Sequence, residues 1–271
     1  GQITGGSIRL GDREITTLSE EEMRAIRGQE IGMIFQEPMT SLNPVHTVGV
    51  QIAEVLIEHE GLTAPEARER AIALIETVGI SEPMRRVDNY PHEMSGGMRQ
   101  RAMIAMALAC RPSILIADEP TTALDVTIQA QILDLMEELQ ARLGMALIFI
   151  THDLSVVAQM AKRVVVMYAG QVVEAGPVAE IFSNPKMPYT AGLIASIPRL
   201  GSSRRGQRLP TIPGHVPSLS ERPSGCRFST RCRHVQPDCR AGSPPLEQVS
   251  DGREVRCLRW RDLDLTSEGA S

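Results

Sequence analysis

The stretch MSGGMRQRAMIAMALACRPSILIADEPTTALD, residues 94–125, decides the fold of this chain. It opens with a Ser-Gly-Gly turn, and Ser95 can cap the Ala- and Met-rich helix that follows. The next apolar run ends at two adjacent carboxylates, Asp118 and Glu119, as a buried strand of a parallel sheet would. Free N–H groups at a helix start favour phosphate binding. The stretch therefore predicts a phosphate-handling site on an α/β sheet.

Two further apolar runs also end on polar side chains. GMIFQEP (32–38) stops at Gln36, and MALIFITHD (145–153) stops at a group that includes His152. Continuous apolar runs of this length are typical of strands buried on both faces. In parallel sheets the ligands bind at the carboxyl ends of the strands. We therefore expect the four polar side chains that end these strands to converge at one edge, namely Gln36, Asp118, Glu119 and His152.

Helices are expected between these strands. Residues 126–144 carry an apolar stripe that includes Ile132 and Leu139, with Asp125 as its N-cap and Gly144 as its C-cap. Residues 63–79 form a second helix, because Pro65 suits a first turn and a glycine ends the pattern. The segment between the first and second strands is mostly helical, so it is interpreted as a helical subdomain inserted into the sheet domain.

Composition narrows the possible functions. The chain has 271 residues, 42% of them hydrophobic, and a net charge of −5, which disfavours a general nucleic-acid binder. No apolar run approaches the ~18 residues of a membrane span. The first ten residues, GQITGGSIRL, lack the pattern of an export signal, and the chain does not begin with Met. We therefore expect the N-terminus to be missing.

Taken together, the motifs resemble those of ATP-binding cassette (ABC) transporter ATPases. MSGGMRQR resembles the family signature, ILIADEP the Walker B strand, TTALD the D-loop, THD the switch-histidine loop and FQEP the Q-loop. More narrowly, FQEPMTSLNP, NPKMPYTAGLIASIP and IPGHVPSL resemble the ATPase subunits of oligopeptide and dipeptide importers. The resemblance implies a P-loop NTPase-like ABC fold, which is a parallel sheet with an inserted helical subdomain.

The resemblance also implies a role for each strand-end residue. Glu119 is the general base that polarises the attacking water, and Asp118 holds Mg²⁺ through water. His152 contacts the terminal phosphate of ATP, while Gln36 contacts Mg²⁺ and the water and couples hydrolysis to the membrane partner. These roles agree with phosphoryl-transfer chemistry, which depends on positioning and charge neutralisation.

A second set of residues is expected to act on nucleotide held by another ATPase subunit. By resemblance, this nucleotide-binding set is Ser95, Gly96, Gly97, Gln100 and Asp125. The implied cofactors are ATP and Mg²⁺. The implied partners are a second ATPase subunit, membrane permease subunits and, indirectly, an extracytoplasmic peptide-binding protein, with no nucleic acid. The protein is then expected to be peripheral, at the cytoplasmic face of the inner membrane.

One family motif is absent from the chain. No stretch reads G-x-x-x-x-G-K-[ST], the Walker A loop that cradles phosphates. In this family that loop precedes the region matching Gly1, so we expect an N-terminally truncated ATPase. The expected parts of the chain are the truncated first part of the ATPase lobe (1–44), the helical subdomain (45–93), the rest of the lobe (94–184) and a C-terminal extension (185–271).

The extension carries a cysteine cluster. Cys226, Cys232 and Cys239 are spaced C-x5-C-x6-C, and Cys257 follows after a stretch that can form a turn and a short strand. A metal centre would supply folding energy that this Pro/Arg-rich segment otherwise lacks. The spacing fits no common zinc finger, and the peptide-importer resemblance implies a [4Fe–4S] cluster. Zinc, with His234 as a possible ligand, and four free thiols are the alternatives.

Cys110 and the segment before the cluster are simpler to interpret. Cys110, at the end of the Ala/Met helix, is interpreted as a small core residue. LGSSRRGQRLP (200–210) is a poor core former and is interpreted as a linker or extended arm.

Two other functions compete with ATP-driven peptide import. A non-hydrolysing ABC partner would donate only its signature motif to a competent subunit, and the absent Walker A loop favours this alternative. A non-transport ABC protein acting on nucleic acid would usually carry two cassettes and a basic surface, whereas this chain shows one cassette and is acidic. The transported molecule (a dipeptide, an oligopeptide, nickel or a sugar) and the choice between homodimer and heterodimer are not predicted.

Overall fold

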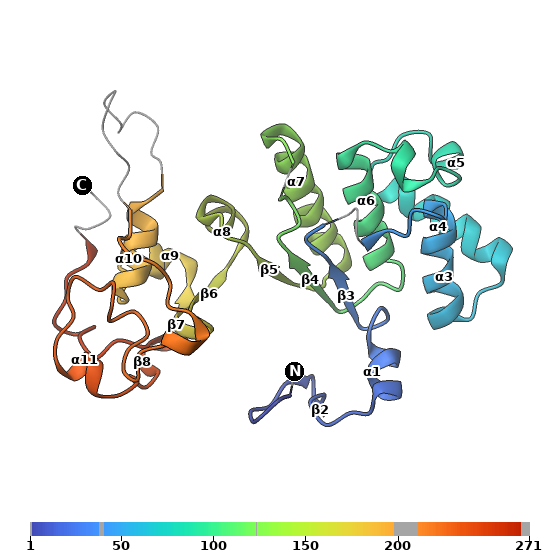
Figure 1. Cartoon of the computed structure of the whole chain (residues 1–271). Helices are drawn as coiled ribbons and strands as arrows, with labels where there is room; N and C mark the ends of the chain where they lie inside the picture. Colours follow the sequence, from blue (N-terminus) through green and yellow to red (C-terminus); the bar gives the residue numbers. More distant parts are fainter. Residues whose placement is uncertain (1, 38–40, 123, 198–210, 267–271) are drawn as a thin grey trace. The chain divides into compact units, whose positions relative to one another are not determined.

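The computed structural model describes residues 2–37, 41–122, 124–197 and 211–266. They form two compact units, residues 1–150 and 151–271, and each is described by itself (Figure 1). The first unit contains β1 (Arg9–Leu10), β2 (Arg13–Glu14), α1 (Glu20–Ile26), β3 (Ile31–Ile34), α3 (Val48–Glu60), α4 (Ala64–Thr77), α5 (Pro83–Arg86), η1 (Pro91–Glu93), α6 (Gly96–Ala107), β4 (Ile114–Asp118), α7 (Val126–Leu143) and β5 (Ala146–Ile150). The second contains α8 (Leu154–Met160), β6 (Arg163–Tyr168), β7 (Gln171–Pro177), α9 (Val178–Ser183), α10 (Pro188–Ala195), η2 (Leu219–Glu221), α11 (Asp238–Ala241), β8 (Glu247–Ser250) and β9 (Arg253–Val255).

The central sheet of the first unit is parallel, as the apolar runs predict. Its order is β3-β4-β5, so the strand that ends in the acidic pair lies in the middle. The β3 strand approaches α6 closely, because a Cβ on Gly32 would lie only 2.4 Å from the Ala107 carbonyl oxygen. A side chain at this position would therefore push strand and helix apart.

Only one face of this sheet is buried, and the expectation of strands buried on both faces was wrong. Ile34, Leu115 and Ala117 are buried on one face. On the other face, Met33 is 38% exposed and Ile148 is 51% exposed. The physical reason is the number of covering layers, since helices among the described residues of the first unit pack on the buried face and leave the other open.

The α7 helix begins and ends where its capping residues predict. The Asp125 side chain accepts hydrogen bonds from the backbone N–H groups of Thr127 and Ile128. Gly144 ends the helix in the left-handed region, with φ 66°. At the centre of the predicted stripe Ile132, Leu135 and Leu139 are buried, whereas Leu143, in the last turn, is 37% exposed. The stripe therefore packs inward through the middle turns of the helix.

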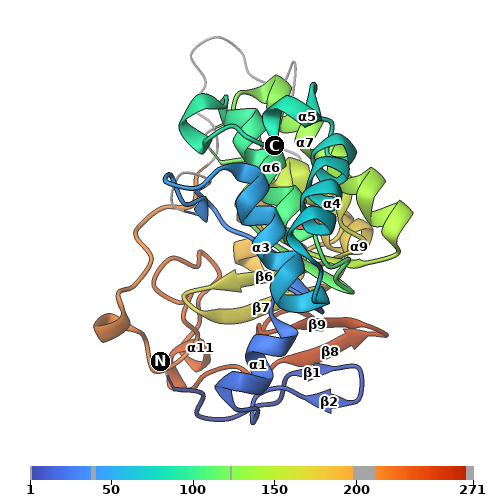
Figure 2. The same ribbon diagram turned by 90° about the vertical axis from the view of Figure 1, so that its right-hand side faces the viewer.

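Helices fill the segment between β3 and β4. The predicted helix over 63–79 is confirmed as α4, with Pro65 in its first turn and a capping box between Thr63 and Glu66. α4 packs against α3 through buried apolar side chains such as Ala71 and Leu56, and Figure 2 shows these two helices side by side. This part of the chain carries its own apolar core, and the four-part division of the chain stays a prediction.

The sheet of the second unit has the order β6-β7-β9-β8, and neighbouring strands pair antiparallel. β8 and β9 form a hairpin between Cys239 and Cys257, where the sequence predicts a turn and one short strand (Figure 2). β9 pairs with β7, which joins the C-terminal region to the rest of the unit. Three aromatic rings form part of the core beside this sheet: Tyr168, Tyr189 and Phe228, with centroids 4.7–5.4 Å apart.

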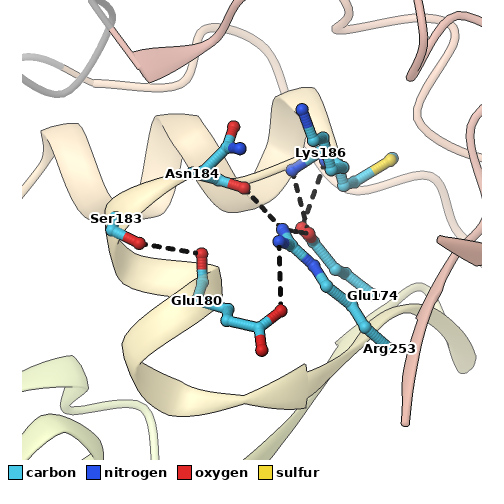
Figure 3. A network of polar contacts seen from close by, with 7 residues as sticks. Glu174, Glu180, Ser183, Asn184, Lys186 and Arg253 are labelled. Atoms are coloured by element: carbon cyan, nitrogen blue, oxygen red, sulfur yellow. Dashed lines mark hydrogen bonds and ion pairs between the residues drawn. The ribbon is translucent and has the colours of Figure 1, made fainter. Parts of the chain in front are cut away.

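A buried ion pair stabilises the junction of β7 and β9 (Figure 3). Arg253 Nη2 donates to Glu174 Oε1 at 2.9 Å, and the two side chains are 4% and 0% exposed. The Glu174 carboxylate also accepts hydrogen bonds from the backbone N–H groups of Lys186 and Met187. Arg253 also donates to the Asn184 carbonyl. These bonds connect the sheet to the loop between α9 and α10.

No helix among the described residues is long and apolar enough to cross a membrane. The segment interpreted as a linker, residues 200–210, lies outside the described residues. The helix α10 (Pro188–Ala195) precedes it.

Candidate nucleotide site at the ends of β3 and β4

Gln36 and Glu119 are in direct contact, as expected for side chains at the ends of adjacent parallel strands. Gln36 Nε2 donates a hydrogen bond to Glu119 Oε2 at 3.1 Å. The two residues are 83 positions apart in the chain, and the pairing of β3 with β4 brings them together. The pair is solvent-exposed, so both side chains are accessible to a ligand.

The backbone of Glu119 is held in an unusual conformation. Its φ is +46°, which is uncommon for a residue with a side chain. Its N–H donates to the Ile150 carbonyl at 2.9 Å, so the sheet pairing continues one residue beyond β4. Asp118, the last residue of β4, is half-buried beside it. Backbone outliers of this kind cluster at functional sites.

The residues of the signature stretch lie at the start of α6. The Ser95 hydroxyl accepts a hydrogen bond from the Met98 N–H at 3.3 Å, which confirms it as the helix cap. A Cβ on Gly97 would lie 3.0 Å from Ile128 Cγ2, so this glycine allows α6 and α7 to pack closely. The Gln100 side chain is 1% exposed, and its Nε2 has no hydrogen-bond partner among the described residues.

The remaining predicted site residues are placed as follows. Asp125 uses its carboxylate to cap α7, next to the turn that contains Glu119. His152 belongs to the second unit, where it precedes α8. Its expected place beside Glu119 therefore stays a prediction. The Gln36–Glu119 contact is thus the part of the predicted convergence that the first unit contains.

One residue of this site was missed by sequence reasoning. Thr122 Oγ1 donates to Glu119 Oε2 at 2.9 Å. Thr122 stands within the quoted TTALD motif, but a threonine in a turn is too common to signal a function by itself. The available signal was its spacing from Glu119, because a residue three positions on can close a turn and direct its hydroxyl back.

In the second unit the four C-terminal cysteines line one cavity of about 20 Å³. His234 and Phe228 also line it. The four thiols are free of disulfides. Burial, and then the proximity of Cys226, Cys232 and Cys239, raise the pKa of the Cys257 thiol to about 12. The four cysteines thus line the same cavity.

The fit of this cavity to a metal centre is partial. The donor type is right, because thiolates bind zinc and iron–sulfur clusters. Among the described residues, however, no group of three or more His, Cys, Asp or Glu is arranged to hold a metal ion. A cavity of about 20 Å³ also has room for little more than one water-sized group. A [4Fe–4S] cluster therefore does not fit the cavity as it stands in this structure.

Comparisons with known proteins agree with this geometry. The ABC transporter family model matches residues 1–122, and the model for the C-terminal region of oligopeptide/dipeptide transporters matches residues 173–239. A putative peptide import ATP-binding protein of Brucella abortus is 56% identical over 272 residues, covering 97% of this chain and 80% of that protein. The chain belongs to the ABC ATPases of the oligopeptide and dipeptide importer family.

Other relatives of this importer ATPase support the assignment. The dipeptide transport ATP-binding protein DppD of Escherichia coli K12 is 49% identical, over 95% of this chain and 78% of its own length. The oligopeptide transport ATP-binding protein OppD of Bacillus subtilis is 54% identical, over 94% of this chain and 71% of its own length. Members of this family hydrolyse ATP, which implies ATP and Mg²⁺ as ligands.

The fold is also shared with solved structures. The ATP-binding cassette MJ0796, in a dimeric post-hydrolysis state bound to ADP and Pi, aligns with a TM-score of 0.58 at 30% identity. The alignment covers 65% of this chain and 74% of that one. The importer ATPase therefore has the P-loop ABC ATPase fold, a mixed α/β architecture.

Proposed function

We propose that this protein hydrolyses ATP to power the import of peptides through membrane permease subunits. The observation that carries the proposal is the Gln36–Glu119 contact of 3.1 Å at the ends of β3 and β4. The contact joins an amide that can orient water to a carboxylate that can accept its proton. The relatives are named as peptide import ATP-binding proteins, which supports peptides as the transported class.

In the proposed reaction Glu119 is the general base. Its carboxylate accepts a proton from water as the water attacks the terminal phosphorus of ATP, and the bond to the β,γ-bridging oxygen breaks to give ADP and phosphate. Asp118 and Gln36 would hold Mg²⁺, whose charge offsets that of the phosphates when it is bound. The oxygen-rich strand end and the half-buried Asp118 support this placement. His152 is proposed to contact the terminal phosphate.

The start of α6 is proposed to act on the nucleotide of a second ATPase subunit. The N-terminus of this 12-residue helix carries free N–H groups and a positive dipole beside Ser95, Gly96 and Gly97. Asp125 is proposed to lie at the subunit seam. Gln100 belongs to the same proposed nucleotide-binding set, and its side chain is buried in this structure. The dimeric, post-hydrolysis structure of MJ0796 supports a paired arrangement. We also propose permease subunits and an extracytoplasmic peptide-binding protein as partners, and the cytoplasmic face of the inner membrane as the location. The names of the relatives, which are peptide transport ATP-binding proteins, support this proposal.

We also infer that Cys226, Cys232, Cys239 and Cys257 hold a metal centre in a C-terminal cysteine-rich extension. Their shared cavity supports this inference, and the family resemblance favours an iron–sulfur cluster over zinc. Iron and sulfide analysis of protein purified without oxygen distinguishes the possibilities. About four irons per chain and absorption near ~400 nm would support the cluster. One zinc per chain without colour would indicate a zinc site instead of the cluster. Four alkylatable thiols without metal would reject the site.

Reconstitution in vesicles tests the transport proposal. The full-length protein is assembled with permease subunits and a peptide-binding protein, and ATP hydrolysis is measured together with uptake of a labelled peptide. Peptide should stimulate hydrolysis, and uptake should require it. Uptake of peptide without ATP consumption, or hydrolysis that no peptide or binding protein changes, would contradict the proposal. A chain that binds its partners but never hydrolyses ATP would be the signature donor considered above.

A further inference from the structure

The turn after β4 holds Glu119 at two points. The backbone N–H of Thr122 donates to the Glu119 carbonyl at 3.1 Å and closes the turn. The Thr122 hydroxyl donates to Glu119 Oε2 at 2.9 Å. The first bond exists for any residue with an N–H, whereas the second depends on the side chain. The hydroxyl therefore adds control of the carboxylate beyond what the turn requires.

The side chains of Gln36 and Thr122 donate to the same oxygen atom of Glu119. Gln36 Nε2 lies 3.1 Å from Glu119 Oε2, and Thr122 Oγ1 lies 2.9 Å from it. One donor comes from the loop after β3 and the other from the turn that contains Glu119. Hydrogen bonds from two directions to one oxygen restrict rotation of the carboxylate about its last side-chain bond, and such positioning is a large part of phosphoryl-transfer catalysis.

The backbone of Glu119 is also fixed, so that the Thr122 hydroxyl acts on a residue whose main chain is already held. At φ +46° the residue is in a region that carries strain for a side chain. The bond from Glu119 N–H to the Ile150 carbonyl holds the backbone on one side of the residue. The hydroxyl of Thr122 holds the side chain on the other.

We propose that Thr122 is a positioning residue that orients the Glu119 carboxylate for proton abstraction. It acts through Glu119 and does not itself touch the reacting atoms. This inference rests on the proposed role of Glu119 as general base. It assigns to Thr122 a hydrogen-bond donor function that serine can supply and that valine and alanine cannot.

Steady-state ATP hydrolysis by the full-length protein in its transporter complex tests the proposal. Thr122→Val should lower kcat by roughly ten- to a hundredfold, because a small misplacement of a catalytic group costs this much. The KM for ATP should change little, and Thr122→Ser should restore most of the rate. Thr122→Ala also removes the hydroxyl but introduces no γ-methyl group, and its kcat should match that of Thr122→Val. Thr127→Val, in the exposed first turn of α7, is the matched control and should keep the wild-type rate.

A comparison with Glu119→Gln separates the two levels of the account. If Glu119→Gln lowers turnover by about 10²–10⁴-fold and Thr122→Val in that background leaves the residual rate unchanged, the hydroxyl acts through the carboxylate. If Glu119→Gln abolishes turnover but Thr122→Val behaves like Thr127→Val, the positioning role is wrong and the base role stands. If Glu119→Gln retains turnover, the base role fails, and the positioning role fails with it.

Discussion

Gln36 Nε2 lies 3.1 Å from Glu119 Oε2, and this hydrogen bond joins the ends of two parallel strands across 83 positions of sequence. Gln36 lies in the loop after β3. A movement of Gln36 would therefore change its hydrogen bond to the Glu119 carboxylate. The contact therefore offers a route by which a partner that touches the loop can change the orientation of Glu119.

Removal of the Gln36 amide should break the hydrogen-bonded link between the loop after β3 and the Glu119 carboxylate. Gln36→Ala is expected to lower kcat for ATP by about tenfold, since a hydrogen bond to a charged acceptor contributes about 1.5–3 kcal/mol and part of it is replaced by water. Peptide stimulation should fall further than the basal rate. The measurement is hydrolysis with and without peptide in vesicles. An unchanged stimulation ratio in Gln36→Ala would show that the contact carries no coupling.

The buried pair in the second unit predicts a large loss of stability. Arg253→Met leaves the Glu174 carboxylate without its cation at 0% exposure, and breaking such a pair costs about 3–5 kcal/mol. Urea denaturation measures the loss. Arg261→Met removes an exposed pair with Glu247 and should cost below ~1 kcal/mol. Adding Glu174→Gln to Arg253→Met should recover part of the stability, and equal losses in the two single variants would contradict the account.

Thr190 predicts a stabilising substitution. Its side chain is buried in α10, and its hydroxyl has no hydrogen-bond partner among the described residues. The neighbouring cavity is lined by apolar side chains such as Val166 and Leu193. Thr190→Val keeps the shape and removes the unsatisfied group, so the free energy of unfolding should rise by about 1 kcal/mol. A loss of similar size in urea denaturation would reveal a hidden partner for the hydroxyl.

Cys110 predicts a dependence of stability on alkaline pH. Burial, followed by the negative charge of Glu60, raises the pKa of this thiol from 9.0 to about 11. The folded state therefore retains the proton more tightly than the unfolded state. The stability that the protonated thiol contributes is fully present below pH 9 and is lost as the pH rises to about 11. Urea midpoints between these pH values should fall more for the wild type than for Cys110→Ala. Parallel curves would show that the thiol titrates normally.

The sequence could predict much of the first unit because its signals are local. The apolar runs predicted the three parallel strands, and Asp125 and Gly144 predicted both ends of α7. The rule that parallel strands end at one edge predicted that Gln36 and Glu119 share that edge, and the β3–β4 pairing brings them into contact.

Other features depend on contacts that no local pattern encodes. The open face at Met33 and Ile148 could not be predicted, because a run of apolar residues does not say how many layers cover a sheet. The Glu174–Arg253 pair joins residues 79 positions apart and needs the β7–β9 pairing to be known first. The hydroxyl of Thr122 became visible only when its distance to Glu119 could be measured.

The most direct test of the account is single-turnover and steady-state ATP hydrolysis by the Glu119→Gln variant of the full-length protein in its transporter complex. The substitution preserves shape, and the amide oxygen of glutamine can accept the hydrogen bonds from Gln36 and Thr122, but an amide cannot accept the proton. Hydrolysis is expected to fall by about 10²–10⁴-fold while ATP binding persists and nucleotide stays trapped in a paired complex. Turnover within about twofold of wild type would contradict the assignment of Glu119 as the base and, with it, the proposed mechanism.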